Sequence, residues 1–453
     1  MLPSKYSERY RSILRLGIPI LVGQAGNIIV GFADNIMVGR YATDALASAS
    51  FVNNIFNIAL FCCMGFSFGL TPLIGALFSQ GEKEKIGATV RNGLIINTVF
   101  TLVVCTLMGM LYFRLDRLGQ PEHLLPIIRP YYLIFLAGIV PMTVFNVFAQ
   151  WSYAINNTKL PTVIIIAANA LNIFGNYALI YGHFGCPELG LTGAGISTLM
   201  ARTVAPVAII CVFFGARAYK AYSRSFRKAR MLRGEASRIF RTSFPVAMQT
   251  SFETAAFSGA ALMAGWLGAV ELASFQIIVI IGMLGFSIYY SFGSATSVLV
   301  SHCAGQNDSR GMRRTAWAGY HVLLVIMTCS CLTFIFFGRD LMSAFSSDPA
   351  VLAMAGTLIF PLVLYQIADA TQINFANALR GTSHVMPMLY IAFVSYIVFG
   401  LPSTYLIAFT LGKGLYGIVL SFSVSLILAA ILFFVFFMRA TRKTAINTPS
   451  TDL

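Results

Sequence analysis

Apolar segments long enough to cross a lipid bilayer recur along the whole chain. As a helix, about 20 predominantly apolar residues span the ~30 Å hydrocarbon core of a membrane. Only 10% of the 453 residues are charged, whereas soluble globular proteins carry roughly 25%. The alternating pattern of a membrane β-barrel is absent from these segments. The sequence therefore predicts an all-α integral membrane protein.

The apolar segments divide into twelve expected transmembrane helices. We place them near residues 13–38, 46–78, 91–115, 128–152, 160–182, 190–216, 239–268, 272–304, 315–338, 350–379, 385–410 and 414–438. The basic, polar start of the chain runs directly into the first helix. We therefore expect no removable signal peptide.

The basic residues are distributed unevenly between the two sides of the membrane. With the N-terminus inside, 24 of the 31 Lys and Arg residues fall in inner segments and six in outer loops. Cytoplasmic loops of membrane proteins are enriched in Lys and Arg, so we expect both termini in the cytoplasm and the protein in the inner (plasma) membrane. The net charge of +15 then reflects topology and attraction to anionic lipid, and no nucleic-acid partner is expected.

The two halves of the chain resemble each other. A shift of 226 residues places Pro19 on Pro245, Gly39 on Gly265 and Pro161 on Pro387, and a shift of 224 places Gly81 on Gly305 and Gly190 on Gly414. Six helices per half is an even number, so both halves enter the membrane from the same side. The pattern predicts two six-helix bundles related by a pseudo-two-fold axis along the membrane normal. The expected domains are an N-terminal lobe (1–216), a basic cytoplasmic linker (217–238), a C-terminal lobe (239–438) and a cytoplasmic tail (439–453).

Three of the sixteen acidic residues lie inside apolar segments: Asp34, Glu253 and Asp369. A charge near the centre of a membrane helix costs about 3 kcal/mol on insertion scales, so such residues usually have a function. Burial disfavours the ionised form, which lets a carboxyl group take up and release a proton. With further oxygen ligands, the same group can instead hold a hard cation such as Na+.

Two polar groups of residues accompany these acids. Asn172 and Asn176 lie four residues apart and share one helix face, and Thr198 is in the next helix. If these helices meet Asp34, the four residues form an oxygen-rich cage, although asparagines also join helices in membranes without further function. Near the other two acids, Gln249 precedes Glu253 by one turn, and Tyr365 precedes Asp369 by one turn with Gln372 beyond. These residues could form a second polar cluster.

Sequence signals for an enzyme are absent. The eight cysteines and five histidines show no metal-ligand spacing, and there is no nucleotide-binding or nucleophile motif. We therefore expect neither catalysis nor a cofactor, and any transport must draw on an ion gradient.

The chain resembles the multidrug and toxic compound extrusion (MATE) family over essentially its whole length. The resemblance lies in Asp34-Asn-Ile-Met-Val-Gly39, in Pro245 with Glu253, in Tyr365-Gln-Ile-Ala-Asp369 and in Ala378-Leu-Arg-Gly381. The acids of helices 7 and 10 are similar to those of the NorM-type branch. Two departures are Asn156-Asn157, where the family often has glycine, and Arg202 inside a helix.

The resemblance implies antiport of organic cations against Na+ or H+ by alternating access. It implies a first cation site at Asp34, Asn172, Asn176 and Thr198, where Na+ could bind, and a second at Glu253, Asp369 and Tyr365. The three acids would also serve as countercharges for the cargo, and the protein would act as a monomer. The alternative is a lipid-linked oligosaccharide flippase of the same superfamily, whose anionic cargo would call for several basic residues in the membrane. Only Arg202 fits that description.

Overall fold

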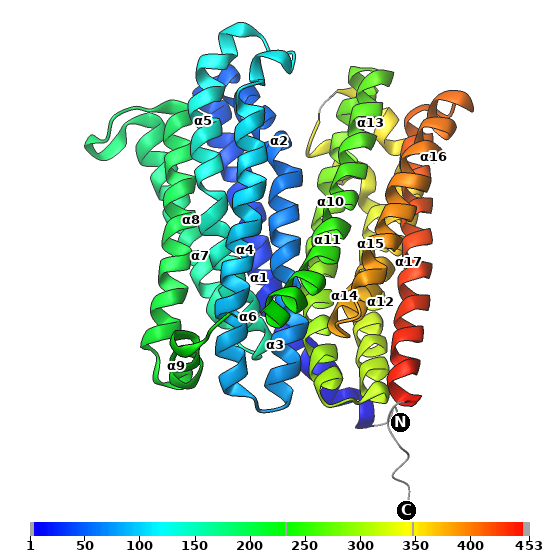
Figure 1. Ribbon diagram of the computed structural model, residues 1–453. Coiled ribbons are helices and arrows are strands. Elements are labelled where there is room, and N and C mark those ends of the chain that lie inside the picture. The colour runs from blue at the N-terminus through cyan, green and yellow to red at the C-terminus, as the bar shows by residue number, and fades with distance from the viewer. Residues whose placement is uncertain (1–3, 232, 347, 447–453) are drawn as a thin grey trace, which may run out of the picture. The chain divides into compact units, whose positions relative to one another are not determined.

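A computed structural model describes residues 4–231, 233–346 and 348–446 of the chain (Figure 1). Helices account for nearly all of these ranges, and no β-strand occurs within them. The structure thus confirms the all-α fold. Residues 447–453, the end of the expected tail, lie outside the described part of the chain, whereas α17 (Gly414–Ile446) continues beyond the expected tail boundary at 439.

Ten helical stretches in the described ranges are long and apolar enough to span a membrane. An eleventh is the pair α13 (Pro349–Thr357) and α14 (Ile359–Gly381), which bends by 53° at its break. The twelfth expected span is α10 (Arg233–Leu267), which is not among these apolar helices. Its sequence contains polar residues such as Gln249 and Glu253. A multi-pass membrane protein follows from these helices.

The helices form two compact units, whose limits differ from the expected lobe boundaries. The first unit is Val22–Ala247, and the second consists of Met1–Leu21 and Met248–Leu453. The difference arises because α1 (Ser4–Tyr41) and α10 are long helices, and each has its first part in one unit and its remainder in the other.

Between these parts of α1 and α10, the first unit contains eight α-helices and four short 3-10 turns. In chain order they are α2 (Thr43–Phe68), α3 (Leu70–Ser79), α4 (Lys83–Tyr112), η1 (Leu115–Arg117), η2 (Glu122–Leu124), α5 (Leu125–Ala137), α6 (Ile139–Ala154), α7 (Lys159–Tyr181), η3 (His183–Gly185), α8 (Gly190–Gly215), η4 (Arg217–Tyr219) and α9 (Lys220–Lys228).

The second unit follows the same order of spans after α10. Its elements are α11 (Ala269–Gly305), α12 (Ser309–Ser343), the bent pair α13 and α14, the continuous stretch α15 (Met386–Ala392), η5 (Phe393–Gly400), α16 (Leu401–Tyr405) and η6 (Leu406–Thr410), and finally α17. In η5 and η6 the backbone is π-helical. The fourth span is broken in both units, after Ala137 in the first and after Thr357 in the second.

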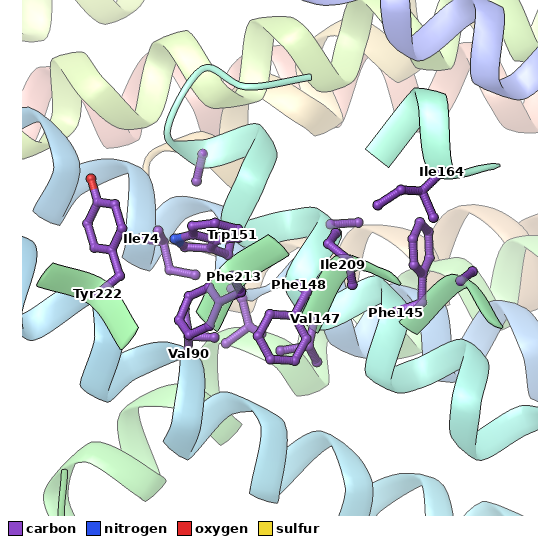
Figure 2. Close-up of a cluster of buried hydrophobic side chains, with 14 of the residues drawn as sticks. Ile74, Val90, Phe145, Val147, Phe148, Trp151, Ile164, Ile209, Phe213 and Tyr222 are labelled. Atoms are coloured by element: carbon purple, nitrogen blue, oxygen red, sulfur yellow. The ribbon is translucent and has the colours of Figure 1, made fainter. Parts of the chain in front are cut away.

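The basic linker contains a helix that the sequence analysis did not predict. Tyr222 of α9 is buried and belongs to a hydrophobic cluster of the first unit, together with Trp151 and Phe213. Figure 2 shows these rings with Phe148, and the centroids of Trp151 and Phe213 are 4.8 Å apart. The cluster fixes α9 against the bundle while its basic residues stay exposed.

Left-handed backbone conformations recur at matching turns of the two units. Asn156 has φ 65° and Ser383 has φ 63°, in the turns that precede α7 and α15. Asparagine tolerates this conformation, so Asn156 replaces a glycine without difficulty. In the turns after α3 and α11, Gly81 has φ 76° and Asn307 has φ 55°. The structural counterpart of Gly81 is therefore Asn307, and the alignment with Gly305 was wrong at this position.

Large apolar side chains are exposed along the helices. On α4, Val99, Val103, Leu107 and Met110 are each at least 55% exposed. In water such a row would be unfavourable, whereas lipid tails solvate it. These residues mark a lipid-facing side of the first unit.

Candidate functional site

Asp34, on the C-terminal part of α1, is partly buried against α7 of the same unit. The side-chain amide of Asn176 donates a hydrogen bond to its carboxylate oxygen Oδ1. Asn172 lies one turn earlier on α7, and with its amide nitrogen turned toward Asp34 it donates to the same oxygen over 2.9 Å. The two asparagines share a helix face, as their spacing predicts.

Thr198 of α8 completes this group. In the same orientation, the amide oxygen of Asn172 accepts from the Thr198 hydroxyl over 3.1 Å. Asn172 and Asn176 are 3% and 0% exposed, so water does not compete for these bonds. We call Asp34, Asn172, Asn176 and Thr198 the Asp34 cage.

Close packing of α7 and α8 makes the cage possible. Small residues let two membrane helices approach closely. A Cβ on Gly193 would collide with the backbone of Leu179, and one on Gly175 would collide with Ser197. The Ser197 hydroxyl also donates to the backbone carbonyl of Asn172 over 2.7 Å. These contacts fix the rotation of α7 that turns its asparagines toward Asp34.

One amide oxygen of the Asp34 cage has no hydrogen-bond donor among the described residues. Oδ1 of Asn176 is buried and accepts no hydrogen bond from any residue in the described ranges. A buried acceptor without a donor is costly and is commonly explained by an unseen water or ion. Carboxylate, amide and hydroxyl oxygens are the ligands that a hard cation prefers, so the donor set of the cage suits Na+ as well as a proton on Asp34.

A second polar group lies in the other unit. Gln249 and Glu253 are one turn apart on α10, and Gln249 Nε2 donates to Glu253 Oε2 over 2.8 Å. Asp369 of α14 is 1% exposed and lies within the electrostatic field of Glu253. Tyr365, one turn before Asp369, is buried and interacts electrostatically with both carboxylates. The structure thus brings together the predicted residues Glu253, Asp369 and Tyr365.

Tyr396 belongs to the same group but was missed by sequence analysis. Its ring is fully buried in the π-helical η5, and it interacts electrostatically with Glu253 and Asp369. Its hydroxyl and Asp369 Oδ2 have no hydrogen-bond partner within the described part of the chain. π-helical turns occur frequently at functional sites. No sequence signal distinguished Tyr396 from the other eighteen tyrosines.

The Gln372 side chain, expected near Asp369, is also buried, and its amide oxygen finds no donor among the residues described. Gln366 of the same helix is 0% exposed, and among the residues described its amide oxygen has no donor and its amide nitrogen has no acceptor. We call Glu253, Asp369, Tyr365 and Tyr396 the acidic pair cluster. Several unpaired polar atoms in one helix bundle leave it able to accept protons or a hydrated cation.

Neither group resembles a transition-metal centre. Within the described ranges, no three His, Cys, Asp or Glu side chains are close enough to hold a metal ion. Cysteines in those ranges are free thiols. What the two groups offer is one isolated carboxylate in a neutral cage and a pair of carboxylates lined by tyrosines.

A comparison with protein-family models finds one family, MatE, matching twice, over residues 19–178 and 245–406. The two matches start 226 residues apart, which is the repeat shift found in the sequence. Together they include Asp34 and its asparagines in the first match, and Glu253, Asp369 and Tyr396 in the second.

Solved structures with a very similar fold include three transporters. A mutant of the Vibrio cholerae MATE transporter VcmN has TM-score 0.88 and 16% identity, and the alignment covers 97% of this chain and 99% of that one. The eukaryotic MATE transporter AtDTX14 has TM-score 0.87 and 17% identity, with 97% and 99% covered. A MOP superfamily transporter from Pyrococcus furiosus has TM-score 0.87 and 17% identity, with 96% and 97% covered. At these identities the likeness establishes the fold.

Proposed function

Because this chain belongs to the MatE family of membrane transporters, we propose that it exports organic cations in exchange for Na+ or H+. Its activity is then transport and not catalysis, and it needs no cofactor besides the coupling ion. The acids of α10 and α14 support a place in the NorM-type branch.

The single observation that carries this proposal is the environment of Asp34. It is the one acid well inside a span of the first unit, since Asp44, Glu84 and Glu122 lie in the first turns of α2, α4 and η2. Uncharged donors from Asn176 and Asn172 hold its carboxylate. No basic side chain in the described ranges lies within ion-pair distance of it. Such a carboxylate is free to exchange a proton or a cation.

The cargo is expected to be a cation for the same reason. A lipophilic cation that enters a low-dielectric protein interior needs a countercharge, and the acids well inside the expected spans are Asp34, Glu253 and Asp369. When the coupling ion neutralises an acid that also holds cargo, the cargo is released. Coupling of this kind typically changes affinity by roughly 5- to 150-fold.

Efflux from proteoliposomes tests the proposal. Ethidium, a fluorescent organic cation, is loaded, and its exit is followed under an imposed Na+ or H+ gradient. Wild type should respond to at least one gradient, and Asp34→Asn should abolish that response while the protein still inserts. The matched control is Asp44→Asn, which removes an exposed acid at the start of α2 and should transport normally. Full gradient-driven efflux by Asp34→Asn would refute the role of Asp34.

Binding measurements separate the two sites. Ethidium affinity is measured at rising Na+ and at falling pH in wild type, Asp34→Asn, Glu253→Gln and Asp369→Asn. Loss of ion sensitivity only in Asp34→Asn would place the switch in the first unit, and loss in the other two would place it in the second. An affinity that neither ion changes in the wild type would end the competition scheme.

The same proteoliposomes also test the alternative, a lipid-linked oligosaccharide flippase. A lipid-linked, negatively charged sugar is offered in place of ethidium. For the Pyrococcus furiosus transporter, a reversed polarity of the binding pocket suggests a different function of that protein. In this chain, three acids and the single Arg202 lie well inside the spans, which favours cationic cargo. Flipping of the anionic lipid without ethidium efflux would reverse that preference.

The setting of this activity is also part of the proposal. We place both termini, and the basic linker with α9, on the cytoplasmic side of the inner (plasma) membrane, on the basis of the 24-to-6 division of basic residues. The transporter is expected to work as a monomer in the lipid bilayer, with no nucleic-acid partner.

A further inference from the structure

Arg202 is a permanent cation inside a membrane-spanning helix, and the two groups described above do not include it. It lies on α8, four residues after Thr198, so the two side chains share one face of the helix. Thr198 belongs to the Asp34 cage. The Arg202 side chain therefore extends from the same face of α8 as Thr198, the residue that completes the cage.

The guanidinium rests on an aromatic ring of α5. Its central carbon lies 4.3 Å from the centroid of Phe135, in a cation–π contact. Gly138, at the break between α5 and α6, leaves room for it: a Cβ there would lie 3.2 Å from Arg202 Nη1. That nitrogen is buried and donates to no acceptor in the part of the chain that the structure describes.

The Asp34 cage and the Arg202 guanidinium each contain one buried atom without a hydrogen-bond partner among the described residues. Asn176 Oδ1 is an acceptor without a donor, and Arg202 Nη1 is a donor without an acceptor, within the described residues. Asp34 and Arg202 attract each other electrostatically, although the ion pairs found in the described ranges do not include this one. A change of Arg202 side-chain conformation toward the cage would satisfy both groups and neutralise Asp34.

We propose that Arg202 is a tethered counter-cation, which competes with the coupling ion for the Asp34 cage and rests on Phe135 when the ion is bound. This inference depends on the proposed antiport. An isolated carboxylate in a low-dielectric site would otherwise bind its ion tightly and release it slowly. A competing guanidinium occupies the cage for part of the time. The apparent dissociation constant of the ion then equals its intrinsic value divided by the fraction of time that the cage is free.

The test is the concentration of the driving ion, Na+ or H+, at which ethidium efflux is half-maximal. Arg202→Gln should lower this concentration about tenfold or more, because the competitor is gone, and it should also lower the maximal rate, because ion release slows. Arg202→Lys keeps a cation and should stay within about threefold of wild type. Phe135→Leu removes the resting place of the guanidinium and should shift the half-maximal concentration upward.

A matched control removes an equivalent arginine elsewhere. Arg227 of α9 also lies over a ring, with its central carbon 5.2 Å from the centroid of Phe214, and takes no part in the cage. Arg227→Gln should leave the half-maximal concentration unchanged. A merely structural role for Arg202 predicts poor insertion and weaker ion dependence in Arg202→Gln, which is opposite in direction to our expectation.

The outcomes distinguish this inference from the proposed function. If neither gradient drives efflux in wild type, the antiport proposal fails and the inference fails with it. If wild type is driven but Arg202→Gln keeps or raises the half-maximal concentration, only the inference is overturned. The inference would also be overturned if Arg202→Lys lowered the half-maximal ion concentration as much as Arg202→Gln does. Should Arg202→Gln not insert, the upward shift in Phe135→Leu decides, and its absence refutes competition.

Discussion

Asn176 donates its side-chain amide to Asp34, and the oxygen of that same amide accepts no hydrogen bond within the described residues. The two residues are 142 positions apart in the chain and meet because α1 and α7 pack in one unit. A hydrogen bond to a charged group is worth about 1.5–3 kcal/mol, so this one helps to hold the Asp34 carboxylate in one orientation inside the membrane. In the proposed antiport, this oxygen is an additional ligand for the coupling cation.

Asn176→Ala should therefore weaken ion dependence. Removing a donor and a cation ligand together is expected to raise the half-maximal ion concentration for efflux by roughly tenfold or more. The control is Asn169→Ala on the same helix, because the Asn169 amide donates to Asn27 over 3.2 Å and not to Asp34. Equal shifts in the two variants would show that the contact with Asp34 has no special role.

Tyr396→Phe should separate function from stability. The hydroxyl has no partner in the described chain, so its removal costs no hydrogen bond and should leave the unfolding midpoint in detergent unchanged or higher. Efflux should fall several-fold, because the hydroxyl lies in the field of Glu253 and Asp369. Tyr132→Phe is the reciprocal control: it deletes a 2.7 Å bond to the Met108 carbonyl and should lower stability with transport retained. Normal efflux by Tyr396→Phe would exclude Tyr396 from the site.

Gly193→Ala should destabilise the first unit. The added methyl group would collide with the Leu179 backbone and force α7 and α8 apart, at a cost of about 1–3 kcal/mol. At Gly109 of α4, a Cβ would have no heavy atom within 4 Å, so Gly109→Ala should stabilise by about 0.5–1 kcal/mol. Thermal unfolding in detergent measures both. A Gly193→Ala midpoint at or above wild type would show that the helices do not need this close approach.

Lys228→Cys should be labelled from the cytoplasmic side only. Position 228 is exposed at the end of α9, so a thiol reagent that cannot cross membranes will reach it once the eight native cysteines are replaced. Lys413→Cys, in an expected outer loop and also exposed, should react only from outside. Labelling of position 228 from outside the cell would invert the proposed topology.

The helical membrane spans and the repeat could be predicted from the sequence. A membrane helix must satisfy its own backbone hydrogen bonds and present apolar side chains to lipid, so its signal lies within one segment. The i, i+4 spacing of Asn172 and Asn176 is local in the same way, and it correctly placed both on one face. Asp34, Glu253 and Asp369 stood out because a carboxylate within an apolar run is costly.

Contacts between segments were decided by the tertiary structure alone. The rotation that turns Asn176 toward Asp34 depends on the close approach of α7 to α8 at Gly193 and Gly175, which no single helix encodes. The same holds for the cation–π contact of Arg202 with Phe135. It also holds for the π-helical turn that carries Tyr396, which interacts with Glu253 and Asp369. The sequence determined which residues are costly to bury in a membrane. Helix packing determined which partners these residues contact, because a contact between two helices depends on their distance and rotation and not on residue spacing within one helix.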